Sequence, residues 1–138
     1  MTPKEYLLNI GKMKRAIEAK REKIRSLEEL ATSATQTITG MPHNPSSTKS
    51  RMADAVCKKV DLEREIAQLE AERSAAIAYL NTLPDTEETT LLIKRYVREL
   101  TWEDIAIEMH YGRTKIYELH KAAVAEFEKR LKREHSRT

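Results

Sequence analysis

The chain has 138 residues, of which 34% are charged and only 5% are aromatic, and it contains three glycines. This composition is typical of solvent-exposed helices and argues against a compact β-sheet protein. The formal net charge of +3 is small, so any affinity for nucleic acid must come from local placement of basic residues. The single cysteine, Cys57, excludes an internal disulfide.

The N-terminal residues lack the apolar core of a signal peptide, and no apolar run is long enough to cross a membrane. We therefore expect a soluble protein of the cytoplasm with no membrane partner.

The first predicted helix begins with a capping box. Thr2 is the cap, Pro3 suits the first helical position, and Glu5 follows the cap by three residues. The residues behind this start alternate at spacings of three and four, which predicts a heptad seam with one polar break at Lys20. The seam consists of Tyr6, Ile10, Met13, Ile17, Lys20, Ile24, Leu27 and Ala31.

Residues 32–50 are rich in small hydroxylated side chains and contain Gly40, Pro42 and Pro45. Such a stretch predicts a loop. A second helix is expected to begin among residues 46–50 and to end at Pro84. It carries a second seam of Leu62, Ile66, Leu69, Arg73, Ala76, Leu80 and Leu83.

The charges of the two predicted helices indicate how they pair. The first helix is basic at Lys4, Lys12, Lys14, Arg15, Lys20, Arg21, Lys23 and Arg25, and the facing part of the second is acidic at Asp61, Glu63, Glu65, Glu70 and Glu72. An antiparallel coiled-coil hairpin over residues 1–84 brings opposite signs together, whereas a parallel self-dimer of the first helix stacks like charges. We expect the hairpin to mediate a homodimer or to bind a protein partner.

Residues 85–138 are predicted to form a small helical domain. Its first helix is expected to begin at Asp85, with Glu88 completing a capping box, and to run to Val97. It should pack behind the two helices that follow.

Residues 101–121 predict two short helices joined by a tight turn. Thr101 and Asp104 form a further capping box, and the turn falls at 110–112, where Gly112 can adopt backbone angles that most residues cannot. Ile105, Ala106 and Met109 are expected on the inner face of the first helix, and Ile116 and Leu119 on that of the second. The second helix should continue from Arg113 past Leu131.

A short helix that braces a second one with basic and polar residues at its exposed start is the layout of a helix-turn-helix DNA reader. The second helix would enter the major groove of double-stranded DNA. The candidate DNA-binding residues are Thr101, Trp102, Arg113, Thr114, Lys115, Tyr117, His120 and Lys121. For Trp102 an alternative is a wedge that holds the preceding helix against the motif.

No catalytic or metal-binding pattern is visible. The histidines at 43, 110, 120 and 135 are scattered, and with one cysteine they give no metal-ligand spacing. The acidic residues lie at helical spacings beside Lys and Arg, which favours solvated faces over acid–base chemistry. We expect no enzyme activity, no cofactor and no metal.

The C-terminal part of the chain resembles region four of bacterial sigma-70-type factors, which reads the promoter −35 element. The matching pieces are LLIKRYV at 91–97, LTWEDIA at 100–106 and the helix from Arg113. Nearly the whole chain also resembles phage and mobile-element proteins of Gram-positive bacteria, some of them late-gene regulators of the autolysin-regulator (ArpU) type. The further marks are TGMPHNP at 39–45, VDLEREI at 60–66 and MHYGRTKIYELHKAAV at 109–124.

This resemblance implies transcription control in the cytoplasm of a bacterial host, with DNA and RNA polymerase as partners. The chain departs from the sigma-like pattern at two positions. His110 stands where a glycine is usual early in the turn, and Gly112 stands where serine usually caps the recognition helix.

Two other functions remain open at this stage. A phage small-terminase-like packaging factor also combines a helix-turn-helix with coiled coil, and it would form a ring. A protein-interaction module would turn the same face toward RNA polymerase and would not bind DNA.

Overall fold

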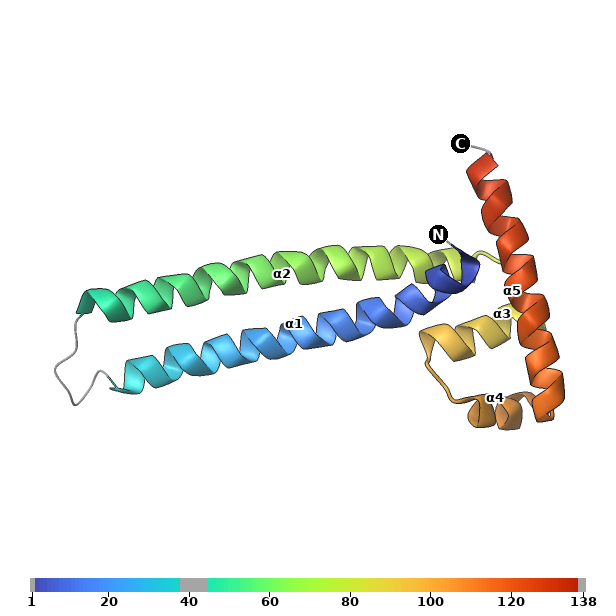
Figure 1. The fold of residues 1–138 in the computed structure, drawn as a ribbon, viewed down its shortest axis with the longest axis horizontal. Coiled ribbons are helices and arrows are strands. Elements are labelled where there is room, and N and C mark those ends of the chain that lie inside the picture. Colours follow the sequence, from blue (N-terminus) through green and yellow to red (C-terminus); the bar gives the residue numbers. More distant parts are fainter. Residues whose placement is uncertain (1, 38–44, 137–138) are drawn as a thin grey trace. The chain divides into compact units, whose positions relative to one another are not determined.

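The computed structural model describes residues 2–37 and 45–136. Within these ranges the regular elements are all helical, which confirms the predicted all-α class. In chain order they are α1 (Pro3–Thr37), α2 (Pro45–Asn81), α3 (Glu87–Leu92), the π-helical turn η1 (Ile93–Val97), α4 (Trp102–Met109) and α5 (Arg113–Ser136) (Figure 1). None of the helices in the described ranges combines the length and apolar character that a membrane span needs.

The chain divides into two compact units. The hairpin unit is Lys14–Glu72, and the bundle unit is Met1–Met13 together with Arg73–Thr138. Sequence patterns place a boundary at residues 84/85 instead. The division differs because the first turns of α1 and the last turns of α2 contribute core residues to the same cluster as the C-terminal helices.

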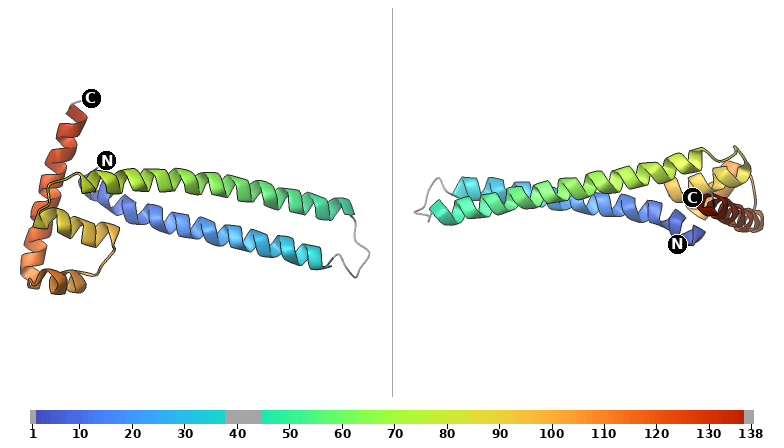
Figure 2. Two further views of the ribbon diagram at one scale, coloured as in Figure 1. Left: turned by 180° about the vertical axis from the view of Figure 1, so that it is seen from behind. Right: turned by 90° about the horizontal axis from the view of Figure 1, so that it is seen from above.

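In the hairpin unit, α1 and α2 run side by side in opposite directions (Figures 1 and 2). Lys20 Nζ lies 2.9 Å from Glu65 Oε2, and Lys59 Nζ lies 2.9 Å from Glu28 Oε1. Residues late in α1 thus pair with residues early in α2, which confirms the predicted antiparallel orientation. Arg21 and Glu70 form a further ion pair.

On the side of the predicted loop, the long helices extend further than their sequences suggest, whereas α2 ends at Asn81 and not at Pro84. α1 continues to Thr37 and α2 already begins at Pro45, so the predicted loop at 32–50 is too long at both ends; residues 38–44 lie outside the described ranges. Within α1 the Oγ1 of Thr32 donates to the carbonyl of Glu28 at 2.9 Å, which gives the hydroxyl a partner inside the helix. Proline at the start of α2 fits because its missing N–H has no helical partner there.

The core of the bundle unit joins α1, α2, α3, η1 and α5. Its buried members are Leu7, Ile10, Ala76, Leu80, Leu92, Tyr96, Ala123 and Phe127. The Phe127 ring lies 5.5 Å from the ring of Tyr6 and 6.0 Å from that of Tyr79, measured between centroids. Such tilted aromatic pairs stabilise the core beyond simple area burial.

α3 begins one residue later than the sequence suggests. Its cap is Thr86, whose extended backbone lets Oγ1 accept the N–H of Thr89, so the prediction of Asp85 as the cap is wrong. The helix then widens into η1, where the N–H of Arg98 donates to the carbonyl of Ile93 at 3.0 Å. The predicted end of this helix at Val97 is confirmed.

The turn between α4 and α5 is a Schellman motif. The N–H of Tyr111 donates to the carbonyl of Ala106 at 3.0 Å, and that of His110 donates to the carbonyl of Ile107 at 3.3 Å. His110 takes the left-handed conformation at φ 60°, and Gly112 has no positive φ. The predicted turn at 110–112 is therefore confirmed, but the residue with unusual backbone angles is His110 and not Gly112. Histidine is among the non-glycine residues that tolerate this region best.

Candidate nucleic-acid interface

A separate small core fixes α5 against α4. Leu91, Ile105 and Ile116 are fully or almost fully buried, and the partly buried side chains around them include Ala106, Met109 and Leu119. This is the inner face predicted for the two helices. Because Ile116 and Leu119 point inward, Tyr117 and Glu118 between them face outward.

The outer face of α5 carries most of the predicted DNA-binding residues. Arg113, Thr114, Lys115, Tyr117 and Lys121 are all exposed. They occupy the first two and a half turns of a helix whose opposite side is buried. The structure therefore brings these five side chains together on one accessible, basic and polar surface.

The two cations at the start of α5 make weak contacts with other residues that the structure describes. Arg113 Nη2 lies 3.3 Å from Glu103 Oε1, and both side chains are about three-quarters exposed. Lys115 Nζ lies 4.6 Å from the centre of the Tyr111 ring. Exposed pairs of these kinds contribute about 1 kcal/mol or less, so both cations can turn to a phosphate or a base without disrupting the fold.

Trp102 occupies the position that the wedge interpretation predicts. The guanidinium carbon of Arg95 from η1 lies 4.5 Å from the centre of its ring, and Tyr117 from α5 stacks on it at 5.8 Å. Trp102 is partly buried. It thus supports the Tyr117 side chain from behind, while Tyr117 itself is 57% exposed.

His120 lies at the inner edge of this surface. Its Nε2 and the Tyr96 hydroxyl are 2.7 Å apart, and its ring packs edge-on against Trp102 at 4.8 Å. Tyr96 belongs to the buried core. His120 therefore connects the outer face of α5 to the interior, and only part of its ring is available to a ligand.

The environment of His120 gives the bundle unit a pH dependence. Burial lowers the pKa of His120 below its ordinary value of 6.5, and the charges of Lys4 and Arg95 lower it further. The unfolded chain therefore binds a proton below about pH 6.5 that the folded chain resists, so stability is lost as pH falls through that value.

We expect the unfolding free energy to fall when the pH drops from about 7.5 to about 5.5, and to fall less in the His120→Gln variant. Urea titrations at the two pH values, followed by the fluorescence of Trp102, measure this difference. Equal pH dependence in the two proteins would contradict the role given to His120.

Thr101 acts first as a helix cap. Its Oγ1 accepts the N–H of Asp104 at 3.1 Å, which confirms the capping half of the predicted box. The residue is exposed and begins α4, where a phosphate could approach the free N–H groups of the first turn.

Two residues of this surface escaped the sequence analysis. Glu118 is exposed on α5 between Tyr117 and Lys121. Lys4, from the first turn of α1, lines an open groove of about 440 Å³ with Tyr117, Glu118, His120, Lys121 and Val124 of α5. Helical spacing could have identified Glu118, whereas no local pattern links Lys4 to a helix more than a hundred residues later.

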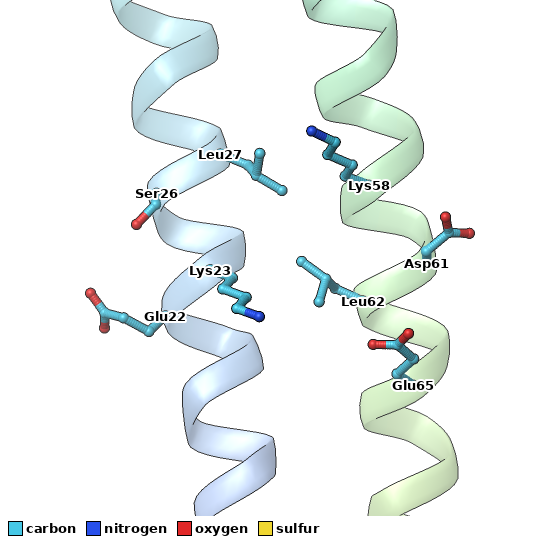
Figure 3. A pocket seen from close by; sticks show the side chains of 8 residues that line it. All are labelled: Glu22, Lys23, Ser26, Leu27, Lys58, Asp61, Leu62 and Glu65. Carbon is cyan, nitrogen blue, oxygen red and sulfur yellow. The ribbon is translucent and has the colours of Figure 1, made fainter.

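The hairpin unit has a groove of its own, of about 470 Å³, between its two helices. Leu27 of α1 and Leu62 of α2 point toward each other there, and charged side chains of both signs surround them (Figure 3). In the parts of the chain that the structure describes, no group of three or more His, Cys, Asp or Glu residues could hold a metal ion.

No protein-family model, no curated protein and no solved structure is significantly similar to the chain.

Proposed function

We propose that this protein is a sequence-specific DNA-binding regulator of transcription, with α5 entering the major groove. The observation that carries the proposal is the asymmetry of α5. Ile116 is buried against α4, while the opposite side of the same turns presents exposed basic and polar residues. A helix of this kind, braced by a shorter one, is the arrangement that reads base edges in helix-turn-helix proteins.

The side chains of the outer face divide into two roles. Arg113, Lys115 and Lys121 supply phosphate contacts or guanine readout, because their cations are exposed. Thr114 and Tyr117 are the candidates for contacts with base edges. Trp102 and His120 hold this surface from behind, with part of each ring able to touch the backbone of the DNA.

The class of genes is inferred from the sequence resemblance alone. LLIKRYV, LTWEDIA and the helix from Arg113 fall on η1 with the end of α3, on α4 and on α5. These four elements of the bundle unit carry or support the candidate interface. On this basis we propose that the regulated genes belong to a phage or mobile element, and that RNA polymerase is a second partner.

The test of DNA binding is selection from a random pool of double-stranded DNA, followed by a shift assay with the enriched sequence and a scrambled control. We expect one sequence family to be enriched and to bind at least about a thousand-fold more tightly than the control. Failure to retain any DNA at low salt would overturn the proposal. If polymerase co-purifies instead, the surface is a protein-interaction site.

The second part of the proposal is a homodimer formed by the hairpin unit. Met52, Val56 and Val60 recur at every fourth residue of α2 and are 37%, 59% and 45% exposed. Such a stripe on one side of a helix is suited to burial against a second helix, and twofold symmetry would place two readers on a two-part site.

We therefore expect light scattering to give twice the mass of one chain, and the double variant Val56→Glu, Val60→Glu to give a single chain mass. A carboxylate at these positions would be buried against the apolar stripe of the partner copy without a compensating partner, which disfavours the dimer. The matched control is Asp54→Lys, at an exposed residue that lies two residues beyond Met52 and so away from the stripe, and this variant should remain dimeric. A monomeric wild type would contradict the dimer, and a larger ring would favour a packaging factor.

A further inference from the structure

The groove between the start of α1 and α5 joins two parts of the chain that lie far apart in the sequence. Lys4 stands on the α1 side and Lys121 on the α5 side. Both lysines are exposed, and within the described residues no carboxylate forms an ion pair with either of them. Tyr117 and Val124 supply apolar surface along the same groove.

This arrangement holds together because α1 is anchored close by. Tyr6 packs on Phe127 of α5, and Leu7 is fully buried in the core that contains Phe127. The first turn of α1 is further fixed by its capping box, in which Thr2 N–H donates to Glu5 and Glu5 N–H donates to Thr2. The position of Lys4 relative to α5 is therefore set by packed residues on either side of it.

The spacing along α5 shows which part of a DNA duplex would meet the groove. Arg113 and Lys121 are eight residues apart, which corresponds to roughly 12 Å along the helix axis. The major groove of B-DNA is about 12 Å wide. The groove is also about 8.5 Å deep, so when the start of an inclined α5 reaches the base edges, a side chain roughly 12 Å further along its axis lies at the level of the sugar–phosphate strands.

We infer that the groove lined by Lys4 and Lys121 binds the sugar–phosphate backbone of DNA beside the stretch that α5 reads. The two ammonium groups pair with phosphate oxygens, and Val124 contacts the deoxyribose between them. This site rests on the proposed function, since it needs α5 in the major groove. It adds α1, which carries no helix-turn-helix motif, to the DNA-binding surface.

Glu118 lines the same groove and opposes phosphate by its charge. Two lysines and one carboxylate still leave the groove with a net positive charge. The exchange Glu118→Gln removes the negative charge and should therefore strengthen binding to scrambled DNA.

The test compares Lys4→Ala, Lys121→Ala and a matched control, Lys12→Ala, which removes an exposed lysine of α1 that does not line the groove. Binding to the selected sequence is measured over a range of salt. Each of the first two variants should lower the slope of log K against log salt by about 0.9 and weaken binding roughly eight-fold at about 0.1 M salt. The control should leave both unchanged.

A second measurement identifies which phosphate of the DNA is bound in the groove. Single methylphosphonate substitutions are made along the flank of the site, each of which removes one phosphate charge. Wild-type protein should lose affinity at one or two of them, and Lys4→Ala should lose that sensitivity while the preference for selected over scrambled DNA is retained.

If Lys4→Ala behaves as wild type while Arg113→Ala weakens binding, the backbone site is wrong and the proposed function stands. If the wild type binds no DNA, both are overturned.

Discussion

Replacing Phe127 by alanine is expected to destabilise the bundle unit by about 3–5 kcal/mol. The Phe127 side chain is 1% exposed and its ring contacts those of Tyr6 and Tyr79, so truncation leaves a cavity where α1, α2 and α5 meet. Since domains are commonly stable by only about 5–15 kcal/mol, the loss is a large part of the total.

Urea unfolding followed by the fluorescence of Trp102 measures this effect, because the chain has one tryptophan and it lies in the bundle unit. The matched control is Phe127→Leu, which keeps more of the side-chain volume and should lose less. A loss below about 1 kcal/mol for Phe127→Ala would contradict the packing role of the ring.

The double replacement Arg113→Ala, Lys115→Ala is expected to have the largest effect on DNA binding. Each cation that contacts a phosphate contributes about 0.9 to the salt slope, and each that reads a guanine contributes about 1–3 kcal/mol of discrimination. We therefore expect the loss of both to weaken binding at least about a hundred-fold and to flatten the salt dependence.

The fold should survive this change, because among the described residues Arg113 pairs with the exposed Glu103 and Lys115 with the partly exposed ring of Tyr111. A matched control is Lys129→Ala, Lys132→Ala, which removes two exposed lysines near the other end of α5. Unchanged affinity and salt slope in the first variant would show that the start of α5 does not contact DNA.

Local patterns predicted the helices of this chain well, because each pattern depends on neighbours within one or two turns. The capping box of Thr2 and Glu5 forms as predicted. The seam residues Ile17 and Ile66 are buried, and Lys20 at the polar break reaches Glu65. Capping and heptad spacing need no knowledge of the rest of the chain.

The turn shows where such patterns mislead. Glycine is the usual residue at a left-handed position, so Gly112 was the natural expectation there. The Schellman bonds from Tyr111 and His110 instead place that conformation at His110. The residue that takes the left-handed conformation is set by which carbonyl groups of α4 accept the hydrogen bonds that close the helix. The residue types in the turn do not specify those carbonyl groups.

The packing between distant segments could not be predicted. Periodicity gives the side of a helix that is buried and leaves the partner undetermined. The cluster of Tyr6, Tyr79 and Phe127 joins three helices that lie far apart in the sequence. The packing of this cluster also brings Lys4 to a groove that it lines with residues of α5. The candidate interface was therefore predicted where it lies on α4 and α5, and missed where α1 contributes.

The most direct test of the central claim places a photoactivatable cross-linker on α5. Cys57→Ser removes the only cysteine, after which a single cysteine replaces Thr114 in one protein and Lys129 in another; both positions are exposed. They lie roughly 22 Å apart along the helix, well beyond the width of one major groove. Irradiation with the selected DNA should cross-link position 114 to bases within the selected sequence and leave position 129 largely unreacted. Equal labelling of both positions, or labelling at 129 alone, would contradict a major-groove role for the start of α5.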